Sequence, residues 1–231
     1  MIAGILQAMA RDRGTDELLV VNEVYASVQG EGTRAGRPCV FVRLTGCGLR
    51  CAWCDTAYAF HEGARRTVDD VVQDVVARGI DLVLLTGGEP LEQPACLPLA
   101  ARLCDAGLEV TVETGGHVDT APLDPRVARI VDVKCPQSGM SQRSRLQDLS
   151  RLRAQDEVKF VVQDRADVDY ALDVIASHGL SQRGCALLFS PVHGVLDPAQ
   201  LAGWLVEHPV RGARLNLQLH KLVWPAATRG V

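Results

Sequence analysis

Three cysteines, Cys47, Cys51 and Cys54, form the pattern C-x3-C-x2-C within the segment CGLRCAWCDT. Thiolates at such short spacing can hold a cubane iron–sulfur cluster, but electron-transfer clusters are ordinarily held by four cysteines. Structural zinc sites also close their coordination shell with four ligands. Three thiolates leave one iron of a cubane without a protein ligand, so that a small molecule can bind there. The spacing therefore favours a catalytic cluster.

A second polar segment, TGGEP at 86–90, follows a short apolar run. Its glycine pair would let the backbone approach a ligand closely, and Glu89 can accept hydrogen bonds from an ammonium group. In isolation the segment fits a tight turn before a helix equally well. Its occurrence behind a three-cysteine segment favours the ligand-binding interpretation.

Three further polar side chains, Gln29, Glu31 and Arg43, surround a glycine-rich segment, QGEG at 29–32. Such a segment is also typical of a hairpin turn. We expect the three side chains to lie near the mouth of the predicted barrel. A carboxylate can accept two parallel N–H bonds from a guanidine-like edge, and arginine pairs bidentately with a carboxylate. The set suits a small acidic molecule that carries an amidine group.

Helical and extended patterns alternate after the cysteine segment, which predicts repeated βα units. Residues 115–126 show no clear helix, so one crossover is expected to be degraded. Repeated βα units form a mostly parallel sheet with right-handed crossovers, either doubly wound or rolled into a partial barrel. Periodicity does not choose between these two α/β architectures. The predicted strands are 41–45, 80–85, 108–114, 129–133, 158–162, 186–189 and 215–219, and the predicted helices are 67–79, 94–107, 144–153, 168–178 and 198–207.

Polar segments follow the predicted strands at the same end. The cysteine segment, 86–90, 113–116, 132–134, 190–193 and 218–220 each come directly after one strand or at its end. Parallel α/β folds bind ligands at the carboxyl ends of their strands. The sequence therefore predicts one site built from all of these segments.

The composition is that of one globular domain. The chain has 231 residues, 47% hydrophobic and 23% charged, enough for one well-buried α/β domain. A net charge of −4 gives no electrostatic support to a nucleic-acid partner, and no apolar run approaches the length of a membrane span. We expect a single domain at 22–231 and an N-terminal arm at 1–21.

Eight cysteines in a chain of this size are better read as reduced cytoplasmic thiols than as disulfides. The apolar first nine residues lack the basic leader of a signal peptide. Free cysteines are commonly buried residues. We expect this structural role for Cys39, Cys96, Cys104, Cys135 and Cys185.

These segments together resemble the radical S-adenosylmethionine (SAM) enzymes and, among them, the 7-carboxy-7-deazaguanine synthase family. The three-cysteine segment and TGGEP carry the wider resemblance. VQGEG at 28–32, RLTGC at 43–47, CAWCDT at 51–56, ETG at 113–115 and QLH at 218–220 carry the narrower one. The similarity runs from about Asn22 to the C-terminus, and QGEG and CDT discriminate best.

The resemblance implies a partial (β/α)-barrel, a 4Fe–4S cluster, SAM used catalytically, and Mg²⁺. The implied reaction is a lyase-type ring contraction of 6-carboxy-5,6,7,8-tetrahydropterin to 7-carboxy-7-deazaguanine with loss of ammonia. It belongs to queuosine and other deazapurine biosynthesis, a tRNA modification pathway. A flavodoxin- or ferredoxin-type reductase and a homodimer are expected on the same basis.

The resemblance also assigns roles to residues at matching positions. The cluster is expected on Cys47, Cys51 and Cys54, and Mg²⁺ on Thr56. The expected pterin contacts are Val28, Gln29, Gly30, Glu31, Arg43, Thr86 and His220. The expected SAM contacts are Trp53, Cys54, Asp55, Gly88, Glu89, Lys134 and Ser190. Only Lys134 matches where other members have Ser-Pro-Lys, and whether Arg229 or the Val231 carboxylate reaches the substrate stays open.

Two other functions remain open from the sequence. A radical SAM activase of a glycyl-radical partner protein would share the cysteine segment and TGGEP, but it gives no reason for QGEG, Arg43 or CDT. A non-catalytic metal or electron-transfer module would need a fourth ligand from another cysteine. His193 and His220 also fit ordinary loop or core histidines.

Overall fold

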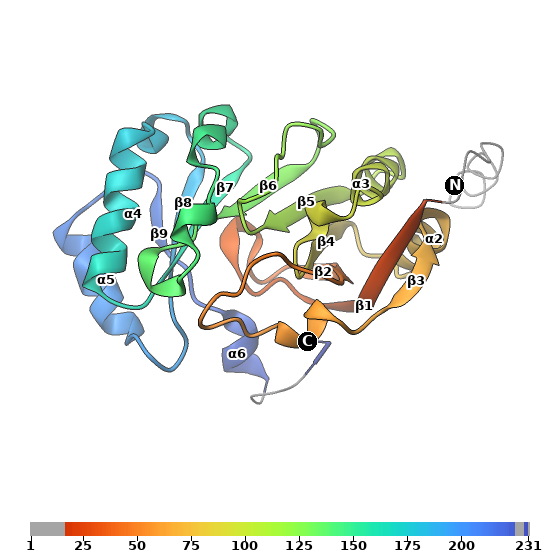
Figure 1. Cartoon of the computed structure of the whole chain (residues 1–231), viewed down its shortest axis with the longest axis horizontal. Coiled ribbons are helices and arrows are strands. Elements are labelled where there is room, and N and C mark those ends of the chain that lie inside the picture. Colours follow the sequence, from red (N-terminus) through yellow and green to blue (C-terminus); the bar gives the residue numbers. More distant parts are fainter. Residues whose placement is uncertain (1–16, 225–228, 231) are drawn as a thin grey trace.

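The computed structural model describes residues 17–224 and 229–230 (Figure 1). Most of the predicted N-terminal arm and the Val231 carboxylate therefore lie outside the described residues. Among the described residues, no helix combines the length and apolar character needed to cross a membrane.

The described residues form one nine-stranded sheet in the order β3-β1-β2-β4-β5-β6-β7-β8-β9. The pairs from β2–β4 to β8–β9 are parallel, whereas β1 is antiparallel to β2 and β3. The strands are β1 (Leu18–Val28), β2 (Pro38–Leu44), β3 (Ala64–Thr67), β4 (Leu82–Gly87), β5 (Glu109–Thr114), β6 (Ala128–Asp132), β7 (Glu157–Val162), β8 (Ala186–Pro191) and β9 (Ala213–Leu215).

The helices begin at the capping residues that the sequence supplies. Thr67 accepts from Asp70 N at the start of α2, and Asp197 accepts from Ala199 N at the start of α5, where Pro198 is the first helical residue. The helices are α2 (Val68–Ala77), α3 (Cys96–Asp105), α4 (Arg165–Ser177), α5 (Pro198–Glu207) and α6 (Leu219–Val223).

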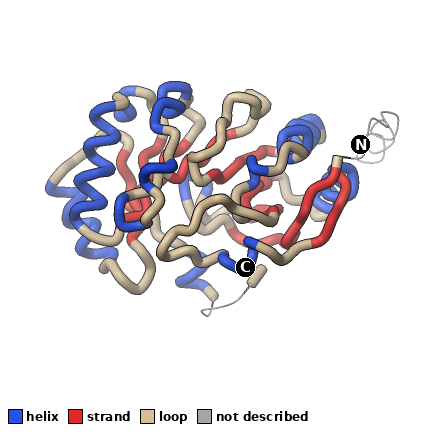
Figure 2. Tube along the Cα trace, viewed as in Figure 1, coloured by secondary structure: helices blue, strands red, loops and turns tan. Residues whose placement is uncertain are grey.

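The strand order decides between the two predicted architectures. From β4 to β9 each strand pairs with the next one in the chain, so the order never reverses as it does in a doubly wound sheet. Right-handed crossovers in one direction place the helices on one face of the sheet. Figure 2 shows helices at the two sides of the molecule and loops in front of the central strands. The fold is thus a partial barrel whose inner face is not covered by the crossover helices α2 to α5.

Alternate strand residues divide between the two faces. Val40 and Val42 of β2 and Val83 of β4 pack in the core cluster that includes α2 and α3. Phe41 and Leu84, one residue along, belong to a separate cluster and line a cavity. The inner face therefore remains available to ligands.

Three sequence predictions differ from the structure. Residues 144–153 form the 3-10 helix Leu146–Arg151, which has no side-chain N-cap. Residues 215–219 leave the sheet after Leu215, because Leu219 N donates to Gly30 O and α6 begins there. Leu18–Val21, assigned to the arm, pair with β2 and β3, because the alternation that buries Leu19 and Val21 makes them strand residues. As predicted, no helix joins β5 to β6.

Candidate functional site

A cavity of about 730 Å³ lies on the inner face of the sheet. Its wall draws on strands β2, β4, β5, β6, β7 and β8, on the cysteine loop and on residues near the C-terminus. Among the predicted site residues, those that line it are Val28, Gln29, Gly30, Glu31, Arg43, Cys47, Cys51, Trp53, Cys54, Asp55, Thr56, Thr86, Gly88, Lys134 and His220. The structure thus brings together all but two of the predicted residues.

The two exceptions are Glu89 and Ser190. Glu89 is fully buried, and its carboxylate accepts from Leu91 N (3.1 Å), Gly115 N (2.7 Å) and Thr114 Oγ1 (2.9 Å). Ser190 is also buried, and its hydroxyl accepts from Asn216 Nδ2 (2.8 Å). Neither residue lines the cavity. Both side chains hold neighbouring segments in place, and their contacts with SAM stay a prediction.

The cysteine loop is held to the end of β4 by backbone contacts. Gly88 N donates to Leu44 O (3.0 Å), and Glu89 N donates to Gly46 O (2.7 Å). A Cβ atom on Gly88 would lie 2.0 Å from Gly46 O, and one on Gly87 would lie 2.2 Å from Leu44 O. From the sequence alone, this glycine pair is predicted to let the backbone approach a ligand closely. In the structure it allows two protein segments to approach each other beside the cavity.

The thiols of the cysteine loop fit a cluster better than a single ion. Cys47 and Cys51 are half-buried, Cys54 is exposed, and all three line the cavity. No three His, Cys, Asp or Glu side chains among the described residues lie close enough together for one metal ion. A cubane spreads its thiolates more widely than a zinc ion does. The donor set therefore suits a multi-iron group.

The other cysteines supply no fourth ligand, since none of the remaining five lines the cavity. Burial raises the pKa of the Cys47 and Cys51 thiols. Their deprotonation therefore depends on a cation such as iron, which displaces the proton when it binds. This arrangement disfavours a closed four-cysteine electron-transfer module.

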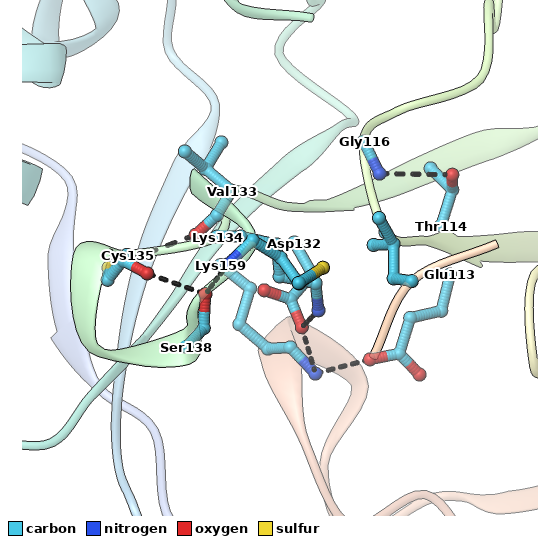
Figure 3. A network of polar contacts seen from close by, with 12 residues as sticks. Glu113, Thr114, Gly116, Asp132, Val133, Lys134, Cys135, Ser138 and Lys159 are labelled. Carbon is cyan, nitrogen blue, oxygen red and sulfur yellow. Dashed lines mark hydrogen bonds and ion pairs between the residues drawn. The ribbon is translucent and has the colours of Figure 1, made fainter. Parts of the chain in front are cut away.

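A charged network lines the cavity, and its central residue, Lys159, was not predicted from the sequence. Lys159 of β7 contacts Glu113 of β5 and lies 3.7 Å from Asp132 Oδ2 (Figure 3). It also lies 3.2 Å from Glu31 Oε2. Lys134 pairs with the same Asp132 oxygen at 2.8 Å. A lone lysine in the buried strand EVKFVV was the available signal, because a charge in such a strand is rare unless it is paired.

Glu31 stays ionised in this network although most of its side chain is shielded from solvent. Burial raises its pKa, but the Lys159 ammonium and a hydrogen bond from Gln218 Nε2 (2.8 Å) are the main influences that lower it below the usual range. Burial lowers the pKa of Lys159, but its carboxylate neighbours raise it well above normal. The pair is therefore charged on both sides at neutral pH.

Arg43 lies among aromatic and acidic partners. Its Nε donates to Glu23 Oε1 (2.7 Å) and its Nη2 to Tyr25 OH (3.1 Å). Arg229 stacks on the Tyr58 ring at 3.8 Å from the centroid and lines the cavity. Within residues 17–224 and 229–230, Arg43 Nη1 has no acceptor, which leaves N–H groups at one edge of the guanidinium for a ligand.

The QGEG segment lies at the opposite end of the barrel from the predicted mouth. Arg34, in the same loop, pairs with Glu109 (2.6 Å) and Glu157 (2.9 Å), the first residues of β5 and β7. The loop at 29–37 therefore closes the amino ends of these strands and forms a floor. The reason is that β1 is antiparallel to β2, so the connection between them lies at the amino end of β2.

The C-terminal segment completes the wall beside the floor. His220 lines the cavity, and a Cβ on Gly30 would lie 2.4 Å from its Nδ1 atom. Burial lowers the pKa of His220, so the ring is neutral at pH 7. Lys221 pairs with Asp55 at 2.8 Å, which ties this segment to the cysteine loop. His193 also lines the cavity.

Comparison with known proteins identifies the family. The profile of the Radical SAM superfamily matches residues 41–177. A 7-carboxy-7-deazaguanine synthase of Koribacter versatilis is 41% identical over 91% of this chain and 99% of its own. One of Chlorobaculum tepidum is 40% identical over 94% and 99%. The crystal structure of QueE from Escherichia coli, 24% identical, superposes with a TM-score of 0.73 over 87% of this chain and 94% of that chain, which shows the same fold.

Proposed function

The chain belongs to the radical SAM superfamily and, within it, to the 7-carboxy-7-deazaguanine synthases; on this premise we propose that it converts 6-carboxy-5,6,7,8-tetrahydropterin to 7-carboxy-7-deazaguanine with loss of ammonia. The observation that carries the proposal is one cavity lined both by three thiols and by Gln29, Glu31 and Arg43. A glycyl-radical activase would have no use for the latter three side chains.

The proposed cofactors are a 4Fe–4S cluster on Cys47, Cys51 and Cys54, and SAM beside it. When bound, these groups supply hydrogen-atom abstraction, which no side chain of the protein can perform. Gly88, Trp53, Asp55 and Lys134 are the proposed SAM contacts, since all of them line the cavity with the cysteines. The protein contributes orientation and exclusion of water.

The pterin is proposed to lie between the floor and Arg43. The guanidinium of Arg43 would pair with the substrate carboxylate, as arginine does in bidentate recognition. Gln29 and Glu31 of the floor would face the N–H groups of the pyrimidinone ring, with Val28, Gly30, Thr86 and His220 completing the wall. Arg43 is thus assigned to the carboxylate of the substrate, and Glu31 to the N–H groups of its ring.

Thr56 is proposed as a Mg²⁺ ligand together with oxygens of the substrate. Its hydroxyl lines the cavity and donates to Asp55 Oδ1 (2.9 Å). Partial desolvation raises the pKa of Asp55, but the Lys221 ammonium and the Thr56 hydroxyl outweigh it and lower the pKa to about 2. A hard cation prefers several oxygen ligands, so a hydroxyl beside a carboxylate suits this role.

Other properties are proposed from the resemblance to the family. The enzyme would receive electrons from a flavodoxin- or ferredoxin-type reductase, form a homodimer in the cytoplasm, and feed queuosine or related deazapurine biosynthesis. The free state of all eight cysteines supports a reducing compartment.

The test of the function is anaerobic turnover. Protein reconstituted with iron and sulfide, then given SAM, reductant, Mg²⁺ and the carboxylated tetrahydropterin, is expected to release 7-carboxy-7-deazaguanine, detected by mass spectrometry. Wild-type protein with an intact cluster that releases no deazapurine would overturn the proposal.

Cys51→Ala tests the role of the cysteine loop. The variant is expected to lose the cluster absorbance and all turnover, because two thiolates cannot hold the cubane. Cys104→Ala is the control, since Cys104 packs against the core away from the cavity, and it should keep wild-type iron content. Normal turnover of Cys51→Ala would refute the assignment.

A further inference from the structure

Lys159 is a buried cation among three carboxylates, and the proposed function gives it no role. Its side chain is 7% exposed, and its ammonium contacts Glu113 and lies 3.2 Å from Glu31 and 3.7 Å from Asp132. We propose that Lys159 is a positioning residue that holds the Glu31 and Glu113 carboxylates as acceptors for the N–H groups of the substrate heterocycle. This inference deepens the proposed function and rests on it.

The geometry shows why one lysine can serve two carboxylates. Lys159 is aligned with Asp132 of the neighbouring strand, and it reaches past β6 to Glu113 of β5. Glu31 approaches from the floor loop on the other side. The ammonium thus joins the floor to the inner face of the sheet; Figure 3 shows its contacts with Glu113 and Asp132 on the sheet side.

The carboxylates of Glu31 and Glu113 both keep unused hydrogen-bond acceptor positions. An ionised carboxylate offers about four acceptor positions. Glu31 receives Gln218 Nε2 (2.8 Å), Asn216 Nδ2 (3.2 Å) and Lys159 Nζ. Glu113 receives Lys159 Nζ and a long bond from Thr86 Oγ1 (3.4 Å). Within the described part of the chain both carboxylates therefore keep lone pairs for a ligand.

The net charge of the network also favours a ligand with hydrogen-bond donors. The network holds the carboxylates of Glu31, Glu113 and Asp132 and the ammonium groups of Lys159 and Lys134, which leaves one negative charge uncompensated. Burial lowers the pKa of nearby His220, so the neutral ring does not cancel this charge. A purely structural ion cluster would be expected to balance its charges. The excess suits a ligand edge that carries N–H donors.

The ionisation of Glu31 links the network to pH. Besides Lys159, the groups that face Glu31 are His220 and Gln218 of the C-terminal segment and Asn216 after β9. Removing the lysine takes away the largest of the influences that lower the pKa of Glu31, so this pKa should rise. A protonated Glu31 would present a donor where the substrate also has donors. Removal of Lys159 should therefore weaken substrate binding most at low pH.

The experiment compares the reconstituted holoenzyme with Lys159→Met and Lys159→Arg. Lys159→Met is expected to raise the KM for the pterin at least about tenfold at pH 7, with the KM for SAM within about twofold of wild type. The ratio of its kcat/KM for the pterin to that of wild type should rise between pH 6 and pH 8. Lys159→Arg keeps the charge and should restore a ratio independent of pH, although not the full affinity.

Arg129→Met is the matched control, because Arg129 is a buried cation paired with Asp156 and does not line the cavity. It should lose stability without a change in the KM for the pterin. A folded Lys159→Met with wild-type KM and a ratio independent of pH overturns the proposal.

If Lys159→Met does not fold, Glu113→Gln decides the question. It leaves the lysine paired with Glu31 and Asp132, and it should raise the KM for the pterin with little change for SAM. An unchanged KM for the pterin in Glu113→Gln overturns the proposal. Failure of wild-type turnover would instead remove the proposed function and this inference with it.

Discussion

Identical side chains take different roles here because their surroundings differ. Burial raises the pKa of Cys39 and of Cys96 to about 12, which keeps both thiols protonated and inert at neutral pH. Cys47, Cys51 and Cys54 instead line the cavity. Access to a ligand thus separates the cluster cysteines from the core cysteines.

Arg43 provides a test at the scale of one residue. Arg43→Ala is expected to weaken pterin binding by about 10- to 100-fold, because a hydrogen-bonded charge pair is worth about 1.5–3 kcal/mol. The affinity for SAM should stay near the wild-type value. Calorimetric titration of each ligand into the reconstituted enzyme measures both affinities.

The control is Arg102→Ala, whose guanidinium pairs with Asp69 away from the cavity; both affinities should be preserved in it. Equal losses of pterin and SAM binding in Arg43→Ala would remove Arg43 from the pterin site.

Among the elements, the floor loop depends most on its contacts with distant strands. Thr33 N and Thr33 Oγ1 donate to Glu157, and Gly32 N donates to Asn216 Oδ1 (2.7 Å). Gly32 has φ +74°, and a Cβ there would lie 2.3 Å from Glu157 Oε2. The position of Glu31 therefore depends on a glycine at the next residue.

Alanine substitutions at two glycines of this loop distinguish the effect of backbone strain from the effect of displacing the loop. Gly32→Ala and Gly36→Ala each place a side chain at positive φ, which costs roughly 1–2 kcal/mol, but nothing lies within 4 Å of a Cβ on Gly36. Both variants should lose stability, Gly32→Ala the more because of its contact with Glu157, and only Gly32→Ala should raise the KM for the pterin. Thermal unfolding and steady-state kinetics give the two quantities. Equal KM values in the two variants would contradict a positioning role for the loop.

Across the whole molecule, a buried ion network takes the place of the helix missing between β5 and β6. Asp156 accepts from Arg129 Nη2 (2.6 Å) and Arg153 Nη2 (2.9 Å), and Arg153 also donates to Val127 O (2.7 Å). These bonds tie the helix-free crossover to the start of β7. The sheet therefore remains continuous where one helix is absent.

Asp156→Asn tests whether this ion network stabilises the crossover that lacks a helix. Removing one partner of a buried ion pair costs about 3 kcal/mol, so urea unfolding at pH 7 should show a loss of that order. Burial raises the pKa of Asp156, but hydrogen bonds from Arg153 and Arg129 outweigh it and lower the value.

A lowered pKa means that Asp156 stabilises the folded state above the unfolded-state pKa of about 3.9. This stability is lost as pH falls through the lower folded-state pKa. The difference in free energy of unfolding between wild type and Asp156→Asn should therefore become smaller below about pH 4. Asp169→Asn, at an exposed pair with Arg165, should change little. A constant difference from pH 7 to pH 3 would contradict the assignment.

The sequence by itself determined the chemistry that local spacing encodes. Cys47, Cys51 and Cys54 needed only their spacing to indicate a cluster with an open iron, and residues 67–79 and 198–207 needed only their local pattern to predict helices. The alternation of βα units likewise predicted a parallel sheet, because turn and capping residues act within a few positions of each other.

Only the tertiary structure decided where side chains point and which distant segments meet. It turned Glu89 and Ser190 away from the cavity, placed the QGEG loop at the floor, and brought Lys159 to Glu31 and Glu113. The physical reason is that a shift of one residue in strand register moves every side chain to the other face. Register and curvature are set by packing between segments far apart in the chain, which local patterns do not contain.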